Sequence, residues 1–226
     1  SKCKSIIYRA FDECQLESGG ISYTKTKIAN DIAIDGMTLN YASYFCREEQ
    51  RIEKLAEHIV NAQLADGGFS YASYLDKGEK NSDAYTTICV LEGLAEYKNA
   101  GFKHQLEKII IAEKKAIQYF LSNGFFMGNK KYLKLTYPYR YYYDILRILE
   151  YFAKEKVPYD NRIKPALKWL ISKRKSDGLW YLEHRHNPKA KVHFEMEELK
   201  KPSRFITLKA LHILSVFNEH VKTMDI

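Results

Sequence analysis

A short phrase recurs along this chain. Its clearest copy reads QLADGGF at residues 63–69, with related copies at 15–21 and 174–180 and a degraded copy at 122–126. The apolar residues that close the copies are 48, 57 and 54 positions apart: Ile21, Phe69, Phe126 and Trp180. A spacing near 50 residues is typical of repeat proteins, in which each unit buries its apolar face by stacking on its neighbours.

Helical patterns fill the stretches between the copies. We expect helices near residues 2–14, 30–46, 49–63, 82–98, 104–121, 138–153, 160–174 and 203–218. Asp31, Ser82, Asp160 and Ser203 are suitable N-caps for four of them. The Gly-Gly pairs within the first two copies stand where a helix must end and the chain must reverse.

The expected helices have two compositions that alternate along the chain. Residues 49–63, 104–121 and 160–174 carry charged residues on one side only, which is typical of a helix with one solvated face. Residues 31–46 and 81–97 contain no Lys or Arg, which predicts burial nearly all round. The alternation predicts an all-α fold with two concentric layers, an α/α barrel or toroid. Its inner helices are expected at 30–46, 82–98, 138–153 and 203–218.

The phrase resembles the QW-type repeat of squalene–hopene cyclases and the related protein prenyltransferases. Residues 135–147, 192–198 and 201–205 resemble stretches of uncharacterised bacterial squalene-cyclase-like repeat proteins. The resemblance implies an α/α toroid with a central pocket. Eight helices make four hairpins, fewer than a complete ring of this superfamily has. We therefore expect one domain over residues 1–226 that forms a partial ring, or the C-terminal part of a longer one.

Composition narrows the classes of partner. Tyrosine is frequent, with 18 copies, which suits a half-wet cavity as well as an ordinary core. The net charge is +8, but the basic residues are spread over many segments and no nucleic-acid motif accompanies them. We therefore expect a solvated basic surface and no nucleic-acid partner.

The cysteines and the apolar runs indicate which cellular compartment to expect. Cys3, Cys14, Cys46 and Cys89 show no Cys-x-x-Cys spacing and are expected as thiols in a reducing, cytoplasmic setting. No apolar run of 18 residues occurs, so no integral membrane segment is expected. No signal peptide is visible.

Catalytic motifs of the resembled enzymes are missing. Neither the Asp-x-Asp-Asp phrase of class II terpene cyclases nor the magnesium-binding Asp-Asp-x-x-Asp of class I synthases occurs. Cys89 with Asp83 is a poor match to the zinc site of protein prenyltransferases. The resemblance therefore implies a fold and a pocket without a mechanism, and we expect neither a cofactor nor a metal site.

Polar residues in apolar surroundings are the first site candidates. Asp35 lies in a helix expected to be dry, where a carboxylate must be paired, neutral or functional. Asp83 and Tyr85 begin the second dry helix, whose positive end suits an anion. Buried pairing of Asp35 and helix capping by Asp83 are the structural alternatives.

Residues 137–147 are a stronger candidate. If the segment is helical, Arg140, Asp144 and Arg147 share one face, surrounded by tyrosines that include Tyr137 and Tyr141. An aromatic cleft with a charged cluster can bind an apolar ligand that has a polar head. A salt-bridged helix face with aromatic packing explains the pattern equally well.

The long connection over residues 176–202 holds the remaining candidates. His193, Glu195 and Glu197 lie on one side of an extended segment, and such a set can supply a general acid or bind a metal. Alternatively, Glu195 and Glu197 pair with Arg140 or Arg204 and pin the loop over the barrel mouth. Both interpretations place the loop at one end of the barrel.

The leading functional hypothesis rests on the resemblance. It is the binding or transformation of an apolar, isoprenoid-like ligand in a central aromatic cleft. Asp144, His193, Glu195 and Glu197 are its candidate catalytic residues, and Asp35, Asp83, Tyr85, Tyr137, Arg140, Tyr141 and Arg204 its candidate ligand-binding residues. The alternatives are a carbohydrate-active enzyme with paired carboxylates and a non-catalytic scaffold that binds a protein. The expected partners are a small apolar or amphipathic molecule and a second copy joined through an open ring edge.

Overall fold

The computed structural model describes residues 2–24, 31–71, 81–185 and 196–222. Over these residues it is all-α, with isolated β-bridges and no strand of a sheet. The chain divides into two compact units, Ser1–Phe120 and Leu121–Ile226, and each is described by itself. The prediction of one repeat domain stays a prediction.

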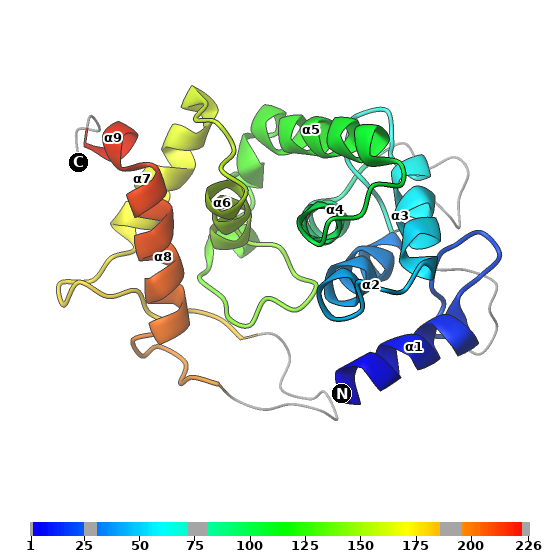
Figure 1. The fold of residues 1–226 in the computed structure, drawn as a ribbon. Coiled ribbons are helices and arrows are strands. Elements are labelled where there is room, and N and C mark those ends of the chain that lie inside the picture. The colour runs from blue at the N-terminus through cyan, green and yellow to red at the C-terminus, as the bar shows by residue number, and fades with distance from the viewer. Residues whose placement is uncertain (1, 25–30, 72–80, 186–195, 223–226) are drawn as a thin grey trace. The chain divides into compact units, whose positions relative to one another are not determined.

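The first unit contains five helices in its described part: α1 (Lys2–Cys14), α2 (Ile32–Phe45), α3 (Arg51–Asn61), α4 (Ala84–Asn99) and α5 (Leu106–Ser122), whose last two residues cross the boundary. Figure 1 shows α2 and α4 side by side at its centre, with α1, α3 and α5 around them. Eleven of the 16 residues of α4 are buried, against four of the 11 residues of α3. The prediction that the helices at 31–46 and 81–97 are more deeply buried than the one at 49–63 is confirmed. Burial nearly all round is wrong for α2, in which eight of 14 residues are buried and Tyr44 is 60% exposed.

Two glycines set the close approach of α2 and α4. A Cβ on Gly36 would lie 2.7 Å from the backbone of Cys89, and a Cβ on Gly93 would collide with the carbonyl oxygen of Gly36. Asn40 adds a hydrogen bond from its amide to the carbonyl oxygen of Glu92 at 3.0 Å. The helices therefore pack backbone against backbone, which a side chain at either glycine would prevent.

The second unit contains longer irregular stretches. Its elements are η1 (Gly124–Phe126), η2 (Lys130–Leu133), α6 (Ile145–Lys154), η3 (Asn161–Ile163), α7 (Lys164–Ser172), α8 (Arg204–Val216) and α9 (Asn218–Val221). Eight of the ten residues of α6 are buried, and α6 packs against α7 and α8. On α8, by contrast, Leu208 is 68% exposed and Leu211 48% exposed. Helix α8 is therefore more exposed than α6, and the prediction that both are inner helices of a toroid stays a prediction.

Each good copy of the repeat phrase forms the same tight turn. A glycine with positive φ donates its N–H to the residue three positions earlier: Gly19 to Leu16, Gly67 to Leu64 and Gly178 to Lys175. The first residue of the phrase then closes the turn. Gln15, Gln63 and Arg174 each donate a side-chain hydrogen bond to that glycine's carbonyl oxygen, at 3.0, 2.8 and 3.0 Å.

The two glutamines also tie neighbouring repeats together. The Gln15 amide reaches the carbonyl oxygen of Arg51 in α3 at 3.2 Å, and the Gln63 amide reaches that of Ala112 in α5 at 2.8 Å. The turn glycines pack on the same two helices, α3 and α5, since a Cβ on Gly19 or Gly67 would strike the carbonyl oxygen of Lys54 or Lys115. The phrase is therefore the joint between one repeat and the next.

The closing residue of the phrase is anchored one turn inside the following helix. The N–H of Phe69 donates to Thr87 Oγ1 at 3.0 Å, and the N–H of Trp180 donates to Thr207 Oγ1 at 3.1 Å. Each threonine lies four residues after the N-cap of its helix, Asp83 or Ser203. Phe69 and Trp180 are both fully buried, as expected of structural wedges.

Two details of the prediction are wrong. In the degraded copy Phe125 is the buried residue, and Phe126 is only half-buried. The helix expected at 138–153 begins only at Ile145, because Asp144 caps it by accepting the N–H of Arg147 at 2.9 Å. Pro138 has no N–H to donate, and Arg140 has φ 54°, so the preceding segment is not helical.

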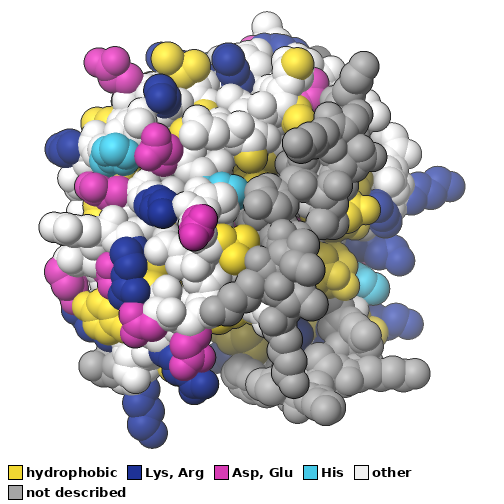
Figure 2. Space-filling model, turned by 90° about the vertical axis from the view of Figure 1, so that its right-hand side faces the viewer, with side chains coloured by type: hydrophobic (Ala, Val, Ile, Leu, Met, Phe, Trp, Pro, Cys, Tyr) yellow, Lys and Arg dark blue, Asp and Glu magenta, His cyan; other side chains and the backbone are white. Residues whose placement is uncertain are grey.

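On the face shown in Figure 2, Lys and Arg side chains are interspersed with Asp and Glu, and single hydrophobic side chains lie among them. Such a mixture is typical of a solvated surface.

We expect Trp180→Ala to lower the free energy of unfolding by about 3–5 kcal/mol, because it leaves a cavity and removes the 2.7 Å hydrogen bond from Trp180 Nε1 to the carbonyl oxygen of Leu170. Urea unfolding followed by circular dichroism measures the change. The half-buried Trp169 provides a control for losing an indole, and Trp169→Ala should cost clearly less. Equal losses for both variants would show that Trp180 is not a wedge.

Candidate functional site

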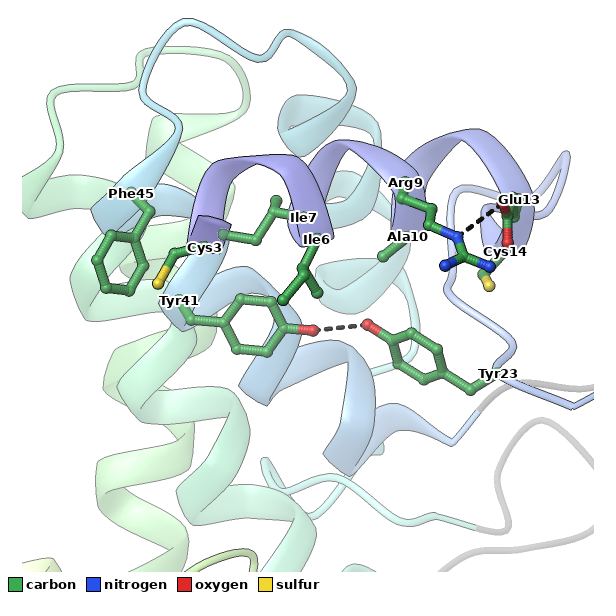
Figure 3. A pocket seen from close by; sticks show the side chains of 10 residues that line it. All are labelled: Cys3, Ile6, Ile7, Arg9, Ala10, Glu13, Cys14, Tyr23, Tyr41 and Phe45. Atoms are coloured by element: carbon green, nitrogen blue, oxygen red, sulfur yellow. Dashed lines mark hydrogen bonds and ion pairs between the residues drawn. The ribbon is translucent and has the colours of Figure 1, made fainter. Parts of the chain in front are cut away.

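An apolar groove lies between α1 and α2 in the first unit. It has a volume of about 460 Å³ and is walled by Ile6, Ile7, Ala10 and Phe45. Figure 3 shows α1 running along one side, with the rings of Tyr41 and Tyr23 on the other. Ile6 is 69% exposed and Phe45 39% exposed, so large apolar side chains face the opening. A concave apolar surface of this size is within the range of small-ligand sites.

Hydroxyl groups converge at one wall of the groove. The hydroxyls of Tyr23 and Tyr41 lie 2.6 Å apart, and Tyr41 donates to Thr38 Oγ1 at 3.0 Å. Burial raises the pKa of Tyr41 well above its ordinary value, so the phenol stays neutral. The hydroxyls of Tyr23, Tyr41 and Thr38 can therefore both donate and accept a hydrogen bond beside the apolar wall of the groove.

Two charged residues are among the described lining of the groove, and both lie towards the C-terminal end of α1. Arg9 Nε and Glu13 Oε1 form an ion pair of 2.8 Å between successive turns of α1. Glu13 is therefore already paired, and it is the one carboxylate among the described residues that line the groove. The thiols of Cys3 and Cys14 lie at opposite ends of the drawn site (Figure 3).

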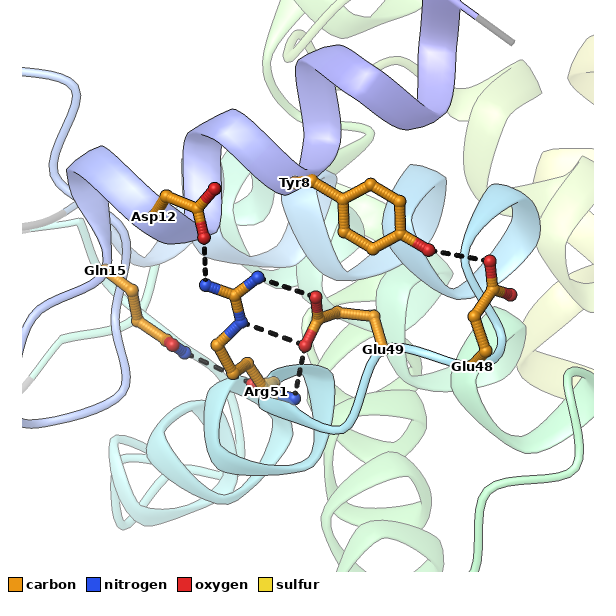
Figure 4. A network of polar contacts seen from close by, with 6 residues as sticks. All are labelled: Tyr8, Asp12, Gln15, Glu48, Glu49 and Arg51. Atoms are coloured by element: carbon orange, nitrogen blue, oxygen red, sulfur yellow. Dashed lines mark hydrogen bonds and ion pairs between the residues drawn. The ribbon is translucent and has the colours of Figure 1, made fainter.

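Polar contacts fasten α1 to the rest of the unit. The Arg51 guanidinium donates to Asp12 of α1 at 2.6 Å and to both carboxylate oxygens of Glu49 at 2.9 and 2.7 Å (Figure 4). Glu48 accepts from Lys4 at 2.6 Å and from the Tyr8 hydroxyl at 2.7 Å. These hydrogen bonds lower the pKa of Glu48 to about 2. Glu48 therefore stays ionised and keeps both partners well below neutral pH.

The structure assigns structural partners to the candidates of the first unit. Asp35 is fully buried, where it accepts the N–H of Ile21 at 2.7 Å and lies 3.5 Å from His58 Nε2. Asp35 lies four residues after Asp31, the N-cap of α2, just as Thr87 lies four residues after the N-cap of α4. Burial lowers the pKa of His58, which favours the neutral ring. Asp35 is thus the anchor of the first copy of the phrase.

Asp83 is a helix cap. It accepts from the N–H and the hydroxyl of Thr86, both at 2.8 Å, and from the N–H of Tyr71 at 3.3 Å. Tyr85 lies in the first turn of α4 and is half-buried. Neither residue lines the groove.

In the second unit, several predicted residues meet at the N-termini of α6 and α8. Tyr137 stacks on Phe205 with ring centroids 4.5 Å apart, and Lys209 lies over the rings of Tyr137 and Tyr139 while it pairs with Glu150. Burial is the main cause that raises the pKa of Tyr137, and the charges of Glu150 and Glu197 raise it further. The charges of this cluster come from Lys209 and Glu150, which the sequence analysis did not single out, and the predicted ligand-binding role of Tyr137 stays a prediction.

Asp144 is the most perturbed acid of this cluster. It is only 3% exposed, and burial raises its pKa to about 7 despite the nearby charge of Arg147. The charge of Arg147 lowers this pKa by less than burial raises it, and the Arg147 guanidinium also donates to the carbonyl oxygen of Tyr142 at 2.5 Å. Asp144 is therefore a buried cap that titrates near neutral pH.

Glu197 meets Arg204 as predicted, with 3.8 Å between Arg204 Nε and Glu197 Oε1. Its main bonds, however, go to the hydroxyl of Ser203 and to the N–H of Arg204, the latter at 2.7 Å. Glu197 thus caps α8, while the Arg204 side chain is 84% exposed. His193 and Glu195 lie outside the described residues.

The shared helical face predicted for Arg140, Asp144 and Arg147 is wrong, because Arg140 precedes the helix. Arg140 is exposed, and the ring of Tyr141, which is 47% exposed, stacks on Tyr142 at 4.1 Å. Sequence reasoning also missed the groove residues Tyr23 and Tyr41. The available signal was the spacing of Ile34, Met37, Tyr41 and Phe45 along one stripe of α2.

Neither a metal nor a membrane span is indicated where the structure is described. No three His, Cys, Asp or Glu residues with described positions cluster as metal ligands would. None of the described helices is long and apolar enough to cross a bilayer.

In comparisons with known proteins, no family model matches this chain and no curated protein matches it. The resemblance to squalene-cyclase-like proteins therefore rests on the quoted residues alone.

We expect Arg51→Ala to loosen α1, because it removes the bridge from Asp12 to Glu49. Amide hydrogen exchange in α1 should accelerate by at least roughly tenfold while exchange in α4 is unchanged. Arg47→Ala is the control, because Arg47 is an exposed neighbour without a described ion pair. Faster exchange in both variants would mean that general charge, and not this bridge, holds α1.

The raised pKa of Asp144 predicts a pH effect of a definite sign. Between about pH 4 and pH 7 the folded protein holds a proton that the unfolded chain has lost, so the free energy of unfolding should fall as pH rises. Asp144→Asn should flatten this slope and keep the cap, since Asn is also a good N-cap.

Asp160→Asn is the matched control. Asp160 caps η3, and its hydrogen bond from Arg162 lowers its pKa to about 2, so its contribution is present above about pH 4 and is lost as pH falls through 2. Urea titrations at several pH values measure both variants. A slope between pH 4 and 7 that survives Asp144→Asn would contradict the assignment.

Proposed function

We propose that this protein binds a small apolar or amphipathic ligand in the groove between α1 and α2. The observation that carries the proposal is the combination of large, partly exposed apolar side chains with one converging set of hydroxyls. Covering Ile6 and Phe45 with an apolar ligand is favourable at about 25 cal/mol per Å² of apolar surface removed from water. The hydroxyls of Tyr23 and Tyr41 then select a ligand with a single polar group.

The wall composition favours binding over glycoside hydrolysis. A carbohydrate-active enzyme needs two carboxylates facing each other across the substrate. The lining of this groove offers Glu13, which Arg9 already neutralises. An isoprenoid alcohol, with a long apolar body and one hydroxyl, matches the groove better than a sugar does.

The wider fold hypothesis supports the same class of ligand. The recurrent Gln-to-carbonyl joint and the alternation of solvated and dry helices in the first unit are what an α/α toroid of the squalene-cyclase type would need. We therefore propose a partial toroid, with its ligand held at the edge between α1 and α2 and not in a central cleft. Fold analogy by itself is a weak reason for assigning a function, so the groove carries the argument.

Farnesol is a suitable probe, and farnesene is the matched hydrocarbon without the hydroxyl. We expect farnesol to bind, and Ile6→Asp to weaken binding at least about tenfold by placing a charge in the groove. The exposed Ile111 of α5 lies outside the groove, and Ile111→Asp should leave the Kd unchanged. Titration followed by intrinsic tyrosine fluorescence, or native mass spectrometry, measures the Kd.

Tyr41→Phe separates recognition of the hydroxyl from apolar burial. Farnesol affinity should fall roughly fivefold, as expected for one lost hydrogen bond, while farnesene affinity should not. Absence of binding, or equal effects of the Asp substitutions at positions 6 and 111, would refute the proposed function.

A further inference from the structure

A basic pocket in the second unit is independent of the apolar groove. It has a volume of about 600 Å³ and is lined by Lys130, Lys134, Lys173, Lys175 and Lys200, together with Leu133, Tyr181, Leu182 and Glu183. The five lysines come from three segments of the chain: η2 and its end, the turn after α7, and the segment that returns to α8.

Backbone hydrogen bonds hold the three segments together. Residues 181–184, which follow the turn after α7, run between the end of η2 and the segment that returns to α8. On the side of η2, the N–H groups of Glu183 and His184 donate to the carbonyl oxygen of Leu135 at 2.9 and 3.2 Å. On the opposite side, Leu182 donates to Lys201 at 3.0 Å and accepts from Lys200 at 2.7 Å. The lysine backbones are thus fixed by the fold, although their side chains extend from it.

Glu183, the carboxylate in the described lining of this pocket, is already paired with Lys173. Glu183 accepts two hydrogen bonds of 2.9 Å from Lys173 Nζ and one of 3.0 Å from the N–H of Leu135. Nearby Asp177 accepts from the Tyr181 hydroxyl at 2.7 Å and from the N–H of Leu179 at 3.0 Å. Among the described residues, no ion pair joins a carboxylate to Lys130, Lys134, Lys175 or Lys200.

Within the described part of the chain, none of these four lysines forms an ion pair with a carboxylate, and like charges around one concavity repel one another. Burial lowers the pKa of the nearby His184, and the charge of Lys134 lowers it further. A bound anion with several charges would relieve the repulsion at all four positions at once.

We propose that this pocket binds a small anion that carries two or more phosphate groups. Lysine ammonium groups are flexible point charges, so they suit a compact polyanion better than a single planar carboxylate, for which the fork of an arginine is matched. The apolar floor of Leu133 and Leu182 accommodates the carbon part of a phosphorylated molecule. The same chemistry is offered by a soluble polyphosphate compound and by a phosphorylated lipid headgroup.

Calorimetric titration of the full chain with inorganic tripolyphosphate tests the site. We expect binding at about 50 mM salt that weakens markedly at about 300 mM, because exposed charges are screened. The double variant Lys134→Gln and Lys200→Gln should bind at least about tenfold more weakly, through the loss of two charge-assisted contacts.

The matched control removes the same charge elsewhere. Lys108 of α5 and Lys164 of α7 are exposed, lie outside the pocket and have no described ion pair. Lys108→Gln with Lys164→Gln should change the Kd less than about twofold, since long-range attraction alone is lost. Equal losses in the two double variants, or no tripolyphosphate binding by the parent, would overturn the proposal.

Two further arms identify the source of the phosphates. Binding to vesicles that contain phosphatidylinositol bisphosphate, but not to neutral vesicles, and its loss in the Lys134/Lys200 variant would support a lipid headgroup. Tripolyphosphate binding without vesicle binding would support a soluble ligand. A single-stranded oligonucleotide that binds more tightly than tripolyphosphate and shows the same lysine dependence would assign the pocket to nucleic acid and overturn the proposal.

Discussion

The repeat joint of this protein depends on one hydrogen bond, from the backbone N–H of a wedge residue to a side chain one turn inside the next helix. Phe69 uses Thr87, Trp180 uses Thr207, and Ile21 uses Asp35. A buried N–H without a partner costs about 1–3 kcal/mol, so this acceptor stabilises the buried wedge in the three good copies of the phrase. The bond therefore couples each turn to the register of the helix that follows it.

The groove forms because the two faces of α2 pack against different helices. The close contact of Gly36 and Gly93 joins one face of α2 to α4. The stripe that carries Tyr41 and Phe45 turns elsewhere and meets α1. Helix α1 is held both by the burial of Ile7 and Phe11 and by exposed polar contacts around Arg51 and Glu48, so core packing and surface ion pairs together fix the wall of the groove that α1 forms.

The two proposed sites have opposite chemistry. The groove presents apolar side chains with a few hydroxyls, whereas the pocket of the second unit presents lysines over a small apolar floor. They lie in different units, and the described residues that line each site all belong to one unit. Their ligands are therefore tested separately, and the failure of one proposal does not weaken the other.

The sequence by itself determined the helical class, the joints and the caps, because all three depend on local patterns: the recurrent phrase, the helices without Lys or Arg, and capping residues such as Asp31 and Ser203. Tertiary structure decided the role of individual polar residues. Asp35 became an anchor and Glu197 a cap, since each accepts from a backbone N–H outside its own turn, 14 and 7 residues away in the sequence. It also gathered the lysines of Lys173–Lys175 and Lys200, which are short separate clusters in the sequence, into one pocket. Backbone hydrogen bonds between segments about 20 to 50 residues apart bring them together, and no local pattern encodes such pairings.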